Sequence, residues 1–246
     1  MTTVALGVDV GGSSIKYAPV NIRIGKVLTE LNSVPTPAHA EPLLNSIAAL
    51  ANALLPDGPV GIALPSVILG GVVHTAANLD AALLGMNAEA ALRKRLGRTV
   101  ALLNDADAAG LAEVRWGAAR GARGTIMMLT FGTGIGSALF TDGRLVPNTE
   151  LGHLEVDGFE GEKRASARAR ADEKLDWPQW AERVSRYLDA INNLFWPDMI
   201  IIGGGVSENF ERFGPLLRSR APLRAATLGA SAGVVGAAMA VAGRDA

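Results

Sequence analysis

The stretch that decides the fold reads Leu6-Gly7-Val8-Asp9-Val10-Gly11-Gly12-Ser13-Ser14-Ile15-Lys16. The β-branched run from Val4 to Val10 predicts a strand, the glycines after it predict a tight turn, and Ile15 to Val20 predicts a second strand. In a turn without Cβ atoms, backbone N–H groups can approach an anion closely. Two serine hydroxyls and the cation of Lys16 add further donors, so the hairpin is a candidate phosphate-binding turn.

A related pattern returns almost half the chain later. Thr125 to Thr130 predicts a strand, Phe131-Gly132-Thr133-Gly134-Ile135-Gly136 predicts a glycine turn, and Ser137 to Phe140 predicts another strand. A third glycine cluster, Gly203-Gly204-Gly205, follows the buried-strand pattern of Met199 to Ile202. A single glycine turn is usually a hairpin without a ligand. Three such clusters favour an α/β protein with two similar halves, each contributing one hairpin to a cleft that holds a polyphosphate chain.

The composition narrows the class of protein. The 246 residues carry 23 basic and 24 acidic side chains, and a net charge of −1 gives no general electrostatic basis for binding nucleic acid. The absence of cysteine excludes disulfides, thiolate zinc sites, iron–sulfur clusters and a catalytic thiol. The chain has no G-x-x-x-x-G-K-[ST] motif, which excludes a P-loop. A dinucleotide-binding fingerprint is excluded because Gly11-Gly12 leads into a strand and not into a helix.

Helical spacing recurs between the strand patterns. It predicts helices over Asn45 to Leu55, Ala81 to Leu96, Ala106 to Trp116, Trp177 to Trp196 and from about Leu228 onward. The last of these lies in an uncharged stretch that is too weakly hydrophobic for a confident membrane span. The N-terminal residues do not resemble a signal peptide, so we expect a cytoplasmic protein that does not associate with membranes.

Polar residues adjoin the predicted turns and strand ends. Asp9 ends the first strand beside phosphate-binding amides, which makes chemical sense if Mg²⁺ lies between carboxylate and phosphate, held through water. Asn104-Asp105 follows a strand and opens a helix, so Asp105 is either a helix N-cap or a base that accepts a hydroxyl proton. Glu150 and His153 can bind adjacent sugar hydroxyls. A metal site is the weaker interpretation, because His153 lacks a cysteine or H-x-x-x-H partner.

Together these residues resemble the ROK family of sugar kinases. The resemblance rests on five segments that follow one another in order along the chain: Leu6 to Lys16, Asn104 to Glu113, Leu129 to Leu139, Pro147 to Glu155, and Phe195 to Ser207. It implies the actin-like (ribonuclease H-like) duplicated α/β fold, with two lobes around a cleft. We expect a smaller lobe at residues 1–103, with the last helix at about 228–246 packed back on it, and a larger lobe at 104–227.

Within the family, the chain is most similar to the branch of bacterial polyphosphate glucokinases, which includes polyphosphate/ATP-glucomannokinases. This similarity implies phosphorylation of glucose or mannose at the 6-hydroxyl by polyphosphate, ATP or both, with Mg²⁺ as cofactor and a homodimer as assembly. Most family members carry a cysteine-rich zinc motif after the Glu-x-Gly-His turn. This chain and that branch lack the motif, so we expect no zinc.

The resemblance also implies roles for individual residues. Asp105 is the base that takes the proton from the sugar 6-hydroxyl. The sugar is bound by Asn78, Asn104, Asp105, Glu150 and His153, and Glu162 matches a further sugar-binding glutamate of the zinc-bearing relatives. The phosphoryl donor is held by Asp9, Gly11, Gly12, Ser13, Ser14, Lys16, Thr133 and Gly134, and the nucleotide region is bordered by Gly203, Gly204 and Gly205.

The basic segment from Lys163 to Lys174 has two interpretations. Its cations either form a solvated face balanced by nearby carboxylates or guide a long polyphosphate chain toward the cleft, in which case the contributing residues are Lys163, Arg164, Arg168 and Arg170.

Other functions stay open at this point. One is a strictly ATP-dependent ROK hexokinase for another hexose, and another is a non-catalytic sugar-sensing protein of the family. A repressor of this family needs an N-terminal helix-turn-helix module, and because a strand is predicted from Val4 we expect no such module. An actin-like ATPase would give no reason for Asn104-Asp105 together with Glu150 and His153.

Overall fold

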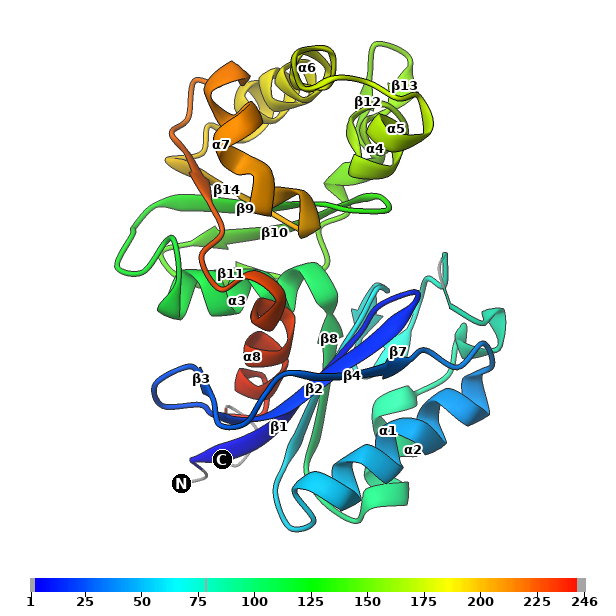
Figure 1. Ribbon diagram of the computed structural model, residues 1–246. Coiled ribbons are helices and arrows are strands. Elements are labelled where there is room, and N and C mark those ends of the chain that lie inside the picture. The colour runs from blue at the N-terminus through cyan, green and yellow to red at the C-terminus, as the bar shows by residue number, and fades with distance from the viewer. Residues whose placement is uncertain (1–2, 78, 243–246) are drawn as a thin grey trace. The chain divides into compact units, whose positions relative to one another are not determined.

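The computed structural model describes residues 3–77 and 79–242 (Figure 1). These residues form two compact units. The first contains the chain up to Ala112 and the segment that starts at Ser231, and the second runs from Glu113 to Ala230. Each unit is built on its own β-sheet with helices packed against it. Asn78, which the sequence analysis assigns to the sugar site, lies outside the described residues.

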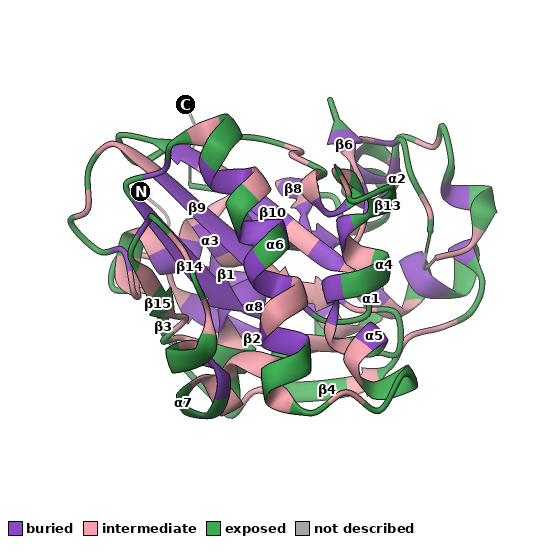
Figure 2. Ribbon diagram, turned by 90° about the horizontal axis from the view of Figure 1, so that it is seen from above, coloured by how far each residue is buried: buried purple, intermediate pink, exposed green. Residues whose placement is uncertain are grey.

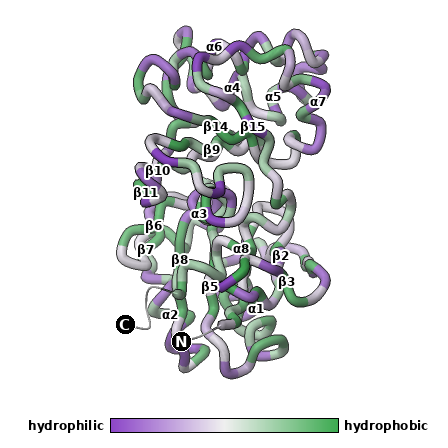
Figure 3. Tube along the Cα trace, turned by 90° about the vertical axis from the view of Figure 1, so that its left-hand side faces the viewer, coloured by the Kyte–Doolittle hydropathy of each residue, from purple (hydrophilic) through white to green (hydrophobic). Residues whose placement is uncertain are grey.

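The first unit is organised by a six-stranded sheet of order β3-β2-β1-β5-β8, with β4 beside β2. Its strands are β1 (Val4–Val10), β2 (Ser14–Asn21), β3 (Lys26–Val27), β4 (Asn32–Pro35), β5 (Val60–Leu64) and β8 (Val100–Asn104). The predicted hairpin β1–β2 is antiparallel, whereas β1–β5 and β5–β8 are parallel. All five residues of β5 are buried, as expected for a parallel strand covered on both faces, and Figure 3 colours this strand hydrophobic.

Helices cover both faces of this sheet. They are α1 (Ala40–Leu54), α2 (Ala88–Leu96) and α8 (Ala232–Met239), with a short β6–β7 hairpin (Ile68–Leu69 and Val72–Val73) in the loop after β5. The helices α1 and α2 enclose a core with Leu6 and Val8 of β1, and α8 packs on the opposite face. A Cβ at Gly7 or Gly61 would overlap the α8 backbone. Strand and helix therefore meet backbone to backbone, which accounts for the Ala/Gly-rich end of the sequence.

The second unit repeats this sheet. Its five strands have the order β11-β10-β9-β14-β15, and they are β9 (Thr125–Phe131), β10 (Ile135–Thr141), β11 (Arg144–Val146), β14 (Met199–Gly203) and β15 (Leu223–Ala225). β9–β10 and β10–β11 are antiparallel, and β9–β14 and β14–β15 are parallel. Order and direction match β3-β2-β1-β5-β8 of the first unit. The predicted α/β class and the repeated strand–glycine turn–strand unit are confirmed.

The core of the second unit lies beneath α6 (Trp177–Phe195). This helix begins with a capping box in which Asp176 and Gln179 satisfy each other's backbone N–H groups. Figure 2 shows its buried and exposed faces, and the buried face carries Trp180 and Tyr187. Both rings meet Phe131 edge to face. Because Phe131 ends β9, this packing fixes the start of the second glycine turn.

Shorter elements complete the second unit. They are the end of α3 (Asp105–Trp116), η2 (Leu151–His153), β12 (Glu155–Val156), β13 (Phe159–Glu160), α4 (Gly161–Ala165), α5 (Ala167–Asp172), η3 (Gly205–Asn209), α7 (Phe210–Phe213), η4 (Gly214–Leu216) and η5 (Gly229–Ser231). Across the described part of the chain, no helix combines the length and the apolar character that a bilayer crossing needs.

Three predicted helices differ from the observed ones. The helix predicted from Asn45 to Leu55 is α1, which already begins at Ala40 and has Glu41 in its first turn. The segment from Ala81 to Leu96 divides into the single turn η1 (Ala81–Leu83) and α2, because Gly85 takes a φ of +75° that a right-handed helix does not allow. The last helix begins at Ala232 rather than at about Leu228. Gly229 has a φ of +52°, which a right-handed helix does not allow, and the buried carboxylate of Glu113 accepts hydrogen bonds from the backbone N–H groups of Thr227 (2.8 Å) and Leu228 (2.7 Å) just before it.

Candidate active site

The first glycine turn joins β1 to β2. The N–H of Gly11 donates to the carbonyl of Ser14 (2.9 Å), which closes the turn. Thr36, just beyond β4, holds the turn from outside. Its hydroxyl donates to the carbonyl of Gly11 (2.7 Å), and its N–H donates to the carbonyl of Ser13 (3.1 Å). Gly12 and Ser13 are exposed at the tip. Thr36 carries no sequence motif, and only the pairing of β4 with β2 brings it to the turn.

Asp9 lies opposite Lys16 in the β1–β2 register. Burial raises the pKa of Asp9 above its ordinary value, and the positive charge of Lys16 lowers it in part. The carboxylate lies against Gly233 of α8, where a Cβ would come within 2.5 Å of Oδ2. The Asp9 carboxylate is a hard oxygen ligand beside the glycine turn, so its chemistry fits Mg²⁺.

The second glycine turn, Gly132 to Gly134, joins β9 to β10. The N–H of Gly132 donates to the carbonyl of Gly134 (3.0 Å), and the N–H of Arg168 in α5 donates to the carbonyl of Gly132 (3.0 Å). Oε2 of Glu162 in α4 accepts from the N–H of Ile135 (3.3 Å). A Cβ at Gly134 would overlap the Glu162 carboxylate. The structure therefore brings Glu162, Thr133 and Gly134 together at one turn.

The third glycine cluster meets the second turn within the same unit. Gly203 ends β14 and is buried, whereas Gly204 and Gly205 are exposed. Gly204 has a φ of +80°, and a Cβ there would overlap the Phe131 backbone. The chain leaving β14 can thus pass directly beside the end of β9.

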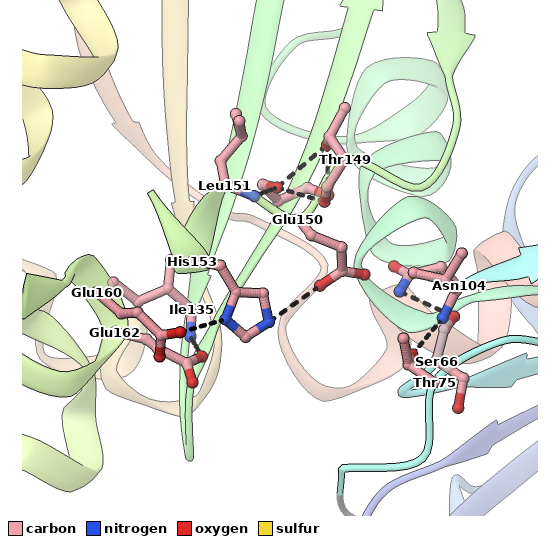
Figure 4. A network of polar contacts seen from close by, with 12 residues as sticks. Ser66, Thr75, Asn104, Ile135, Thr149, Glu150, Leu151, His153, Glu160 and Glu162 are labelled. Carbon is pink, nitrogen blue, oxygen red and sulfur yellow. Dashed lines mark hydrogen bonds and ion pairs between the residues drawn. The ribbon is translucent and has the colours of Figure 1, made fainter. Parts of the chain in front are cut away.

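Asn104 and Asp105 lie where β8 ends and α3 begins. Oδ1 of Asn104 accepts from the N–H groups of Ala106 (2.8 Å) and Asp107 (3.1 Å), so Asn104 is the N-cap of α3. Its Nδ2 donates to the carbonyl of Ser66 (3.2 Å; Figure 4). Asp105 is half-buried in the first helical turn, where the helix dipole favours negative charge. Asn104 therefore takes the capping position that the sequence left open for Asp105, and Oδ1 of Asp105 also accepts from the N–H of Ala106 (2.8 Å).

Glu150 and His153 flank the single turn η2, and Figure 4 shows their side chains facing each other. Nε2 of His153 lies 4.0 Å from Oε2 of Glu150. Burial raises the pKa of Glu150; His153 lowers it in part and Glu162 raises it further. The segment is fixed to β10, because the hydroxyl of Ser137 donates to the carbonyl of Thr149 (2.6 Å) and accepts from the N–H of Leu151 (3.0 Å).

One group of side chains in the second unit has the composition of a metal site. The potential ligand atoms of His153, Glu160 and Glu162 all lie within 4.8 Å of one another. An imidazole with two carboxylates can bind several divalent cations. His153 and Glu160 are half exposed and already paired with each other, with Nδ1 3.6 Å from Oε1. Glu160 belongs to no motif of the sequence.

The basic segment divides into two parts. Lys163, Arg164 and Arg168 are exposed, and Arg168 is the residue whose backbone contacts the second glycine turn. Arg164 lies over the ring of Phe159 (4.8 Å to the centroid). Arg170 is half-buried over Trp177 (3.7 Å) and serves packing.

Comparison with known proteins decides the family. The profile of the ROK family matches residues 5–167, which is well over half of the chain. The chain belongs to the ROK family. Polyphosphate glucokinases of Mycobacterium tuberculosis and Mycobacterium leprae are each 48% identical to it, over 95% of this chain and 89% and 73% of theirs, respectively.

Solved structures of ROK proteins agree with this assignment. The inorganic polyphosphate/ATP-glucomannokinase from Arthrobacter sp. strain KM has a TM-score of 0.93 and 44% identity, with 99% of this chain and 100% of that chain covered. A ROK glucokinase from Streptomyces griseus, in complex with glucose and AMPPNP, has a TM-score of 0.81 and 25% identity, with 96% and 98% covered. The fold is therefore the actin-like two-domain fold of the ROK sugar kinases.

Proposed function

We propose that this ROK protein phosphorylates glucose, and also mannose, at the 6-hydroxyl, with inorganic polyphosphate or ATP as the donor. The observation that carries the proposal is the high identity to polyphosphate glucokinases over nearly the whole chain, together with the close structural match to a polyphosphate/ATP-glucomannokinase. The two glycine turns and Asp105 at the start of α3 supply the kinds of group that phosphoryl transfer needs.

The proposed reaction moves one proton and one phosphoryl group. Asp105 takes the proton of the sugar 6-hydroxyl, and the oxygen attacks the terminal phosphorus of the donor. The bond from that phosphorus to the donor's bridging oxygen breaks, so a shortened polyphosphate or ADP leaves. Asn104 fixes the position of Asp105 by capping α3. Such positioning, with charge neutralisation, accounts for most of the catalysis of phosphoryl transfer.

In this proposal, one set of residues binds the sugar and another set holds the phosphoryl donor. Glu150, His153 and Glu162 bind sugar hydroxyls, together with Asn104 and Asn78. The first turn and Lys16 hold the phosphoryl donor, as do Thr133 and Gly134 of the second turn, and Gly203 to Gly205 border the nucleotide. Asp9 would hold Mg²⁺, and the ion would neutralise phosphate charge. Zinc has no part in this proposal.

Donor, sugar and metal requirements are tested in one activity matrix. Polyphosphate and ATP are each assayed against glucose, mannose, fructose and N-acetylglucosamine, with and without Mg²⁺. We expect glucose 6-phosphate from both donors and only with Mg²⁺. Activity with ATP alone would favour an ATP-dependent hexokinase, and sugar binding without turnover would favour a sugar-sensing protein.

A homodimer and a cytoplasmic location are part of the proposal. Light scattering coupled to size exclusion tests the first, since a dimer has twice the 25.5 kDa of one chain. Cell fractionation tests the second.

We also propose that the exposed cations Lys163, Arg164 and Arg168 guide long polyphosphate. Arg168 supports this best, because its backbone contacts the second glycine turn. Replacing Arg164 and Arg168 with alanine should raise the polyphosphate KM about tenfold, an effect that weakens with salt, and should leave the ATP KM nearly unchanged. Arg220→Ala is the matched control, since Arg220 also lies over an aromatic ring, that of Trp196. Equal effects on both donors would contradict guidance.

A further inference from the structure

The side chain of His153 has a carboxylate at each ring nitrogen. Nε2 faces Oε2 of Glu150 at 4.0 Å, and Nδ1 faces Oε1 of Glu160 at 3.6 Å (Figure 4). Glu150 belongs to the proposed sugar-binding set. Glu160 does not, and the proposed mechanism gives it no role.

We propose that Glu160 is a positioning residue that holds His153 in the tautomer with the proton on Nδ1, so that Nε2 accepts a hydrogen bond from a sugar hydroxyl. This inference rests on the proposed sugar-binding role of His153. A neutral imidazole has one N–H donor and one acceptor nitrogen, and the partner of one nitrogen decides the state of the other. Carboxylates orient metal-binding histidines in this way, and the same hydrogen bond can fix a histidine that binds a hydroxyl.

The backbone around the pair places Glu160 beside His153. Glu160 ends β13, and the N–H of the next residue, Gly161, donates to the carbonyl of Leu154 (2.8 Å), the residue after His153. On the other side, the hydroxyl of the buried Tyr187 donates to the carbonyl of Leu151 (3.1 Å) at the start of η2. The segments that carry Glu160 and His153 are therefore held by hydrogen bonds to backbone carbonyls within one unit.

Each carboxylate near His153 faces a different partner. Oε2 of Glu160 faces the ammonium of Lys163 (3.9 Å), which leaves Oε1 toward His153. Glu162 is occupied by the N–H of Ile135. Glu150 faces the opposite nitrogen. The distance of 3.6 Å is longer than a hydrogen bond, and such contacts often tighten when the substrate binds.

The first test reads the tautomer without any enzymatic reaction. The chain has three histidines, so the ¹⁵N signals of His153 can be assigned by comparison with His153→Asn. In mildly alkaline buffer with EDTA, the parent protein should show the proton on Nδ1. Glu160→Ala should move the population toward Nε2–H, and Glu160→Gln, whose amide oxygen is a weaker acceptor, should lie between the two. Identical spectra for parent and Glu160→Ala would overturn the proposal.

The second test separates glucose binding from turnover. Glu160→Ala should raise the glucose KM about tenfold, the lower end for loss of an orienting carboxylate, with little change in kcat or in the donor KM. Glu160→Gln should recover part of the loss. Glu155→Ala is the matched control, because Glu155 pairs with Glu160 in the β12–β13 register and is exposed. Thermal melts of all variants verify folding.

The two tests distinguish the possible failures. If the parent does not phosphorylate glucose, the proposed function fails and the spectra still report on Glu160. If the parent is active and Glu160→Ala has the parent's glucose KM, the positioning role fails alone. A His153 spectrum that changes when Zn²⁺ replaces EDTA, with Glu160→Ala insensitive to zinc, would make Glu160 a metal ligand and overturn the proposal as well.

Discussion

The two glycine hairpins share one topology and differ in what surrounds the turn. In the first hairpin, the cross-strand pair one step before the pair that adjoins the turn is Asp9–Lys16. The equivalent pair in the second hairpin is Thr130–Gly136. At this position, only the first hairpin has a pair of opposite charges. The first turn is tied by Thr36, which has no other role here, and the second is tied by Glu162 of the proposed sugar site. In the proposed function, the charged pair of the first hairpin acts on the phosphoryl donor, and Glu162 connects the second hairpin to the sugar.

The same asymmetry appears at the sheet edges. β8 and β15 occupy equivalent positions in the two sheets. β8 leads into Asn104-Asp105 and a capped helix, whereas β15 leads into Ala226-Thr227, whose backbone is bound by Glu113. Only the first of these equivalent positions carries a carboxylate that can act as a base.

The largest expected effect comes from removing that base. Asp105→Asn keeps the size of the side chain and the cap at Asn104, so glucose binding should persist. The kcat should fall at least about a hundredfold, the low end for loss of a general base. Steady-state kinetics and isothermal titration with glucose measure the two quantities. A rate near that of the parent would show that Asp105 is not the base. The carboxylate after β8 would then not distinguish the two units in function.

A smaller effect should separate the two turns. Glu162→Ala removes a charged acceptor from the Ile135 N–H, and a bond of that kind contributes about 1.5–3 kcal/mol. The glucose KM should rise by about tenfold or more, and the donor KM should rise with it, because Glu162 contacts both the turn and the sugar set.

Thr36→Val is the matched change at the first turn. It removes one neutral hydrogen bond, worth about 1 kcal/mol, so the donor KM should rise about fivefold while the glucose KM stays unchanged. A coupled rise in both constants for Thr36→Val, or an isolated one for Glu162→Ala, would contradict the distinction between the hairpins.

The sequence predicts local features of this molecule well. Both hairpins, the buried strand β5 and the position of Asn104-Asp105 follow from short patterns of β-branched residues and glycine. The contacts made across the fold could not be predicted, because Thr36, Glu113 and Glu160 have no local signature and reach their partners only through strand pairing or a turn. The segment around Gly85 was predicted wrongly for a local reason. The positive φ of this glycine interrupts a helix that the spacing of apolar residues predicts.

The smallest expected effect concerns the charged pair itself. Burial raises the pKa of Asp9, so the folded chain holds a proton on this carboxyl more tightly than the unfolded chain does. The stability from that proton is present in full below the ordinary carboxyl pKa and is lost as the pH rises through the higher pKa of the folded state. At pH values above the raised pKa, the ionised Asp9 therefore opposes folding.

Asp9→Asn removes this charge and should stabilise the protein at pH values above the raised pKa of Asp9, while lowering activity. A gain of about 1 kcal/mol corresponds to a rise in Tm of about 2–4 °C for a chain of this length. The gain should shrink as the pH falls, because the parent's Asp9 then becomes protonated. Thr130→Val, at the equivalent position of the second hairpin, should change Tm by the same amount at every pH. Differential scanning calorimetry across the acidic range measures both, and a pH-independent gain for Asp9→Asn would show that its charge does not oppose folding.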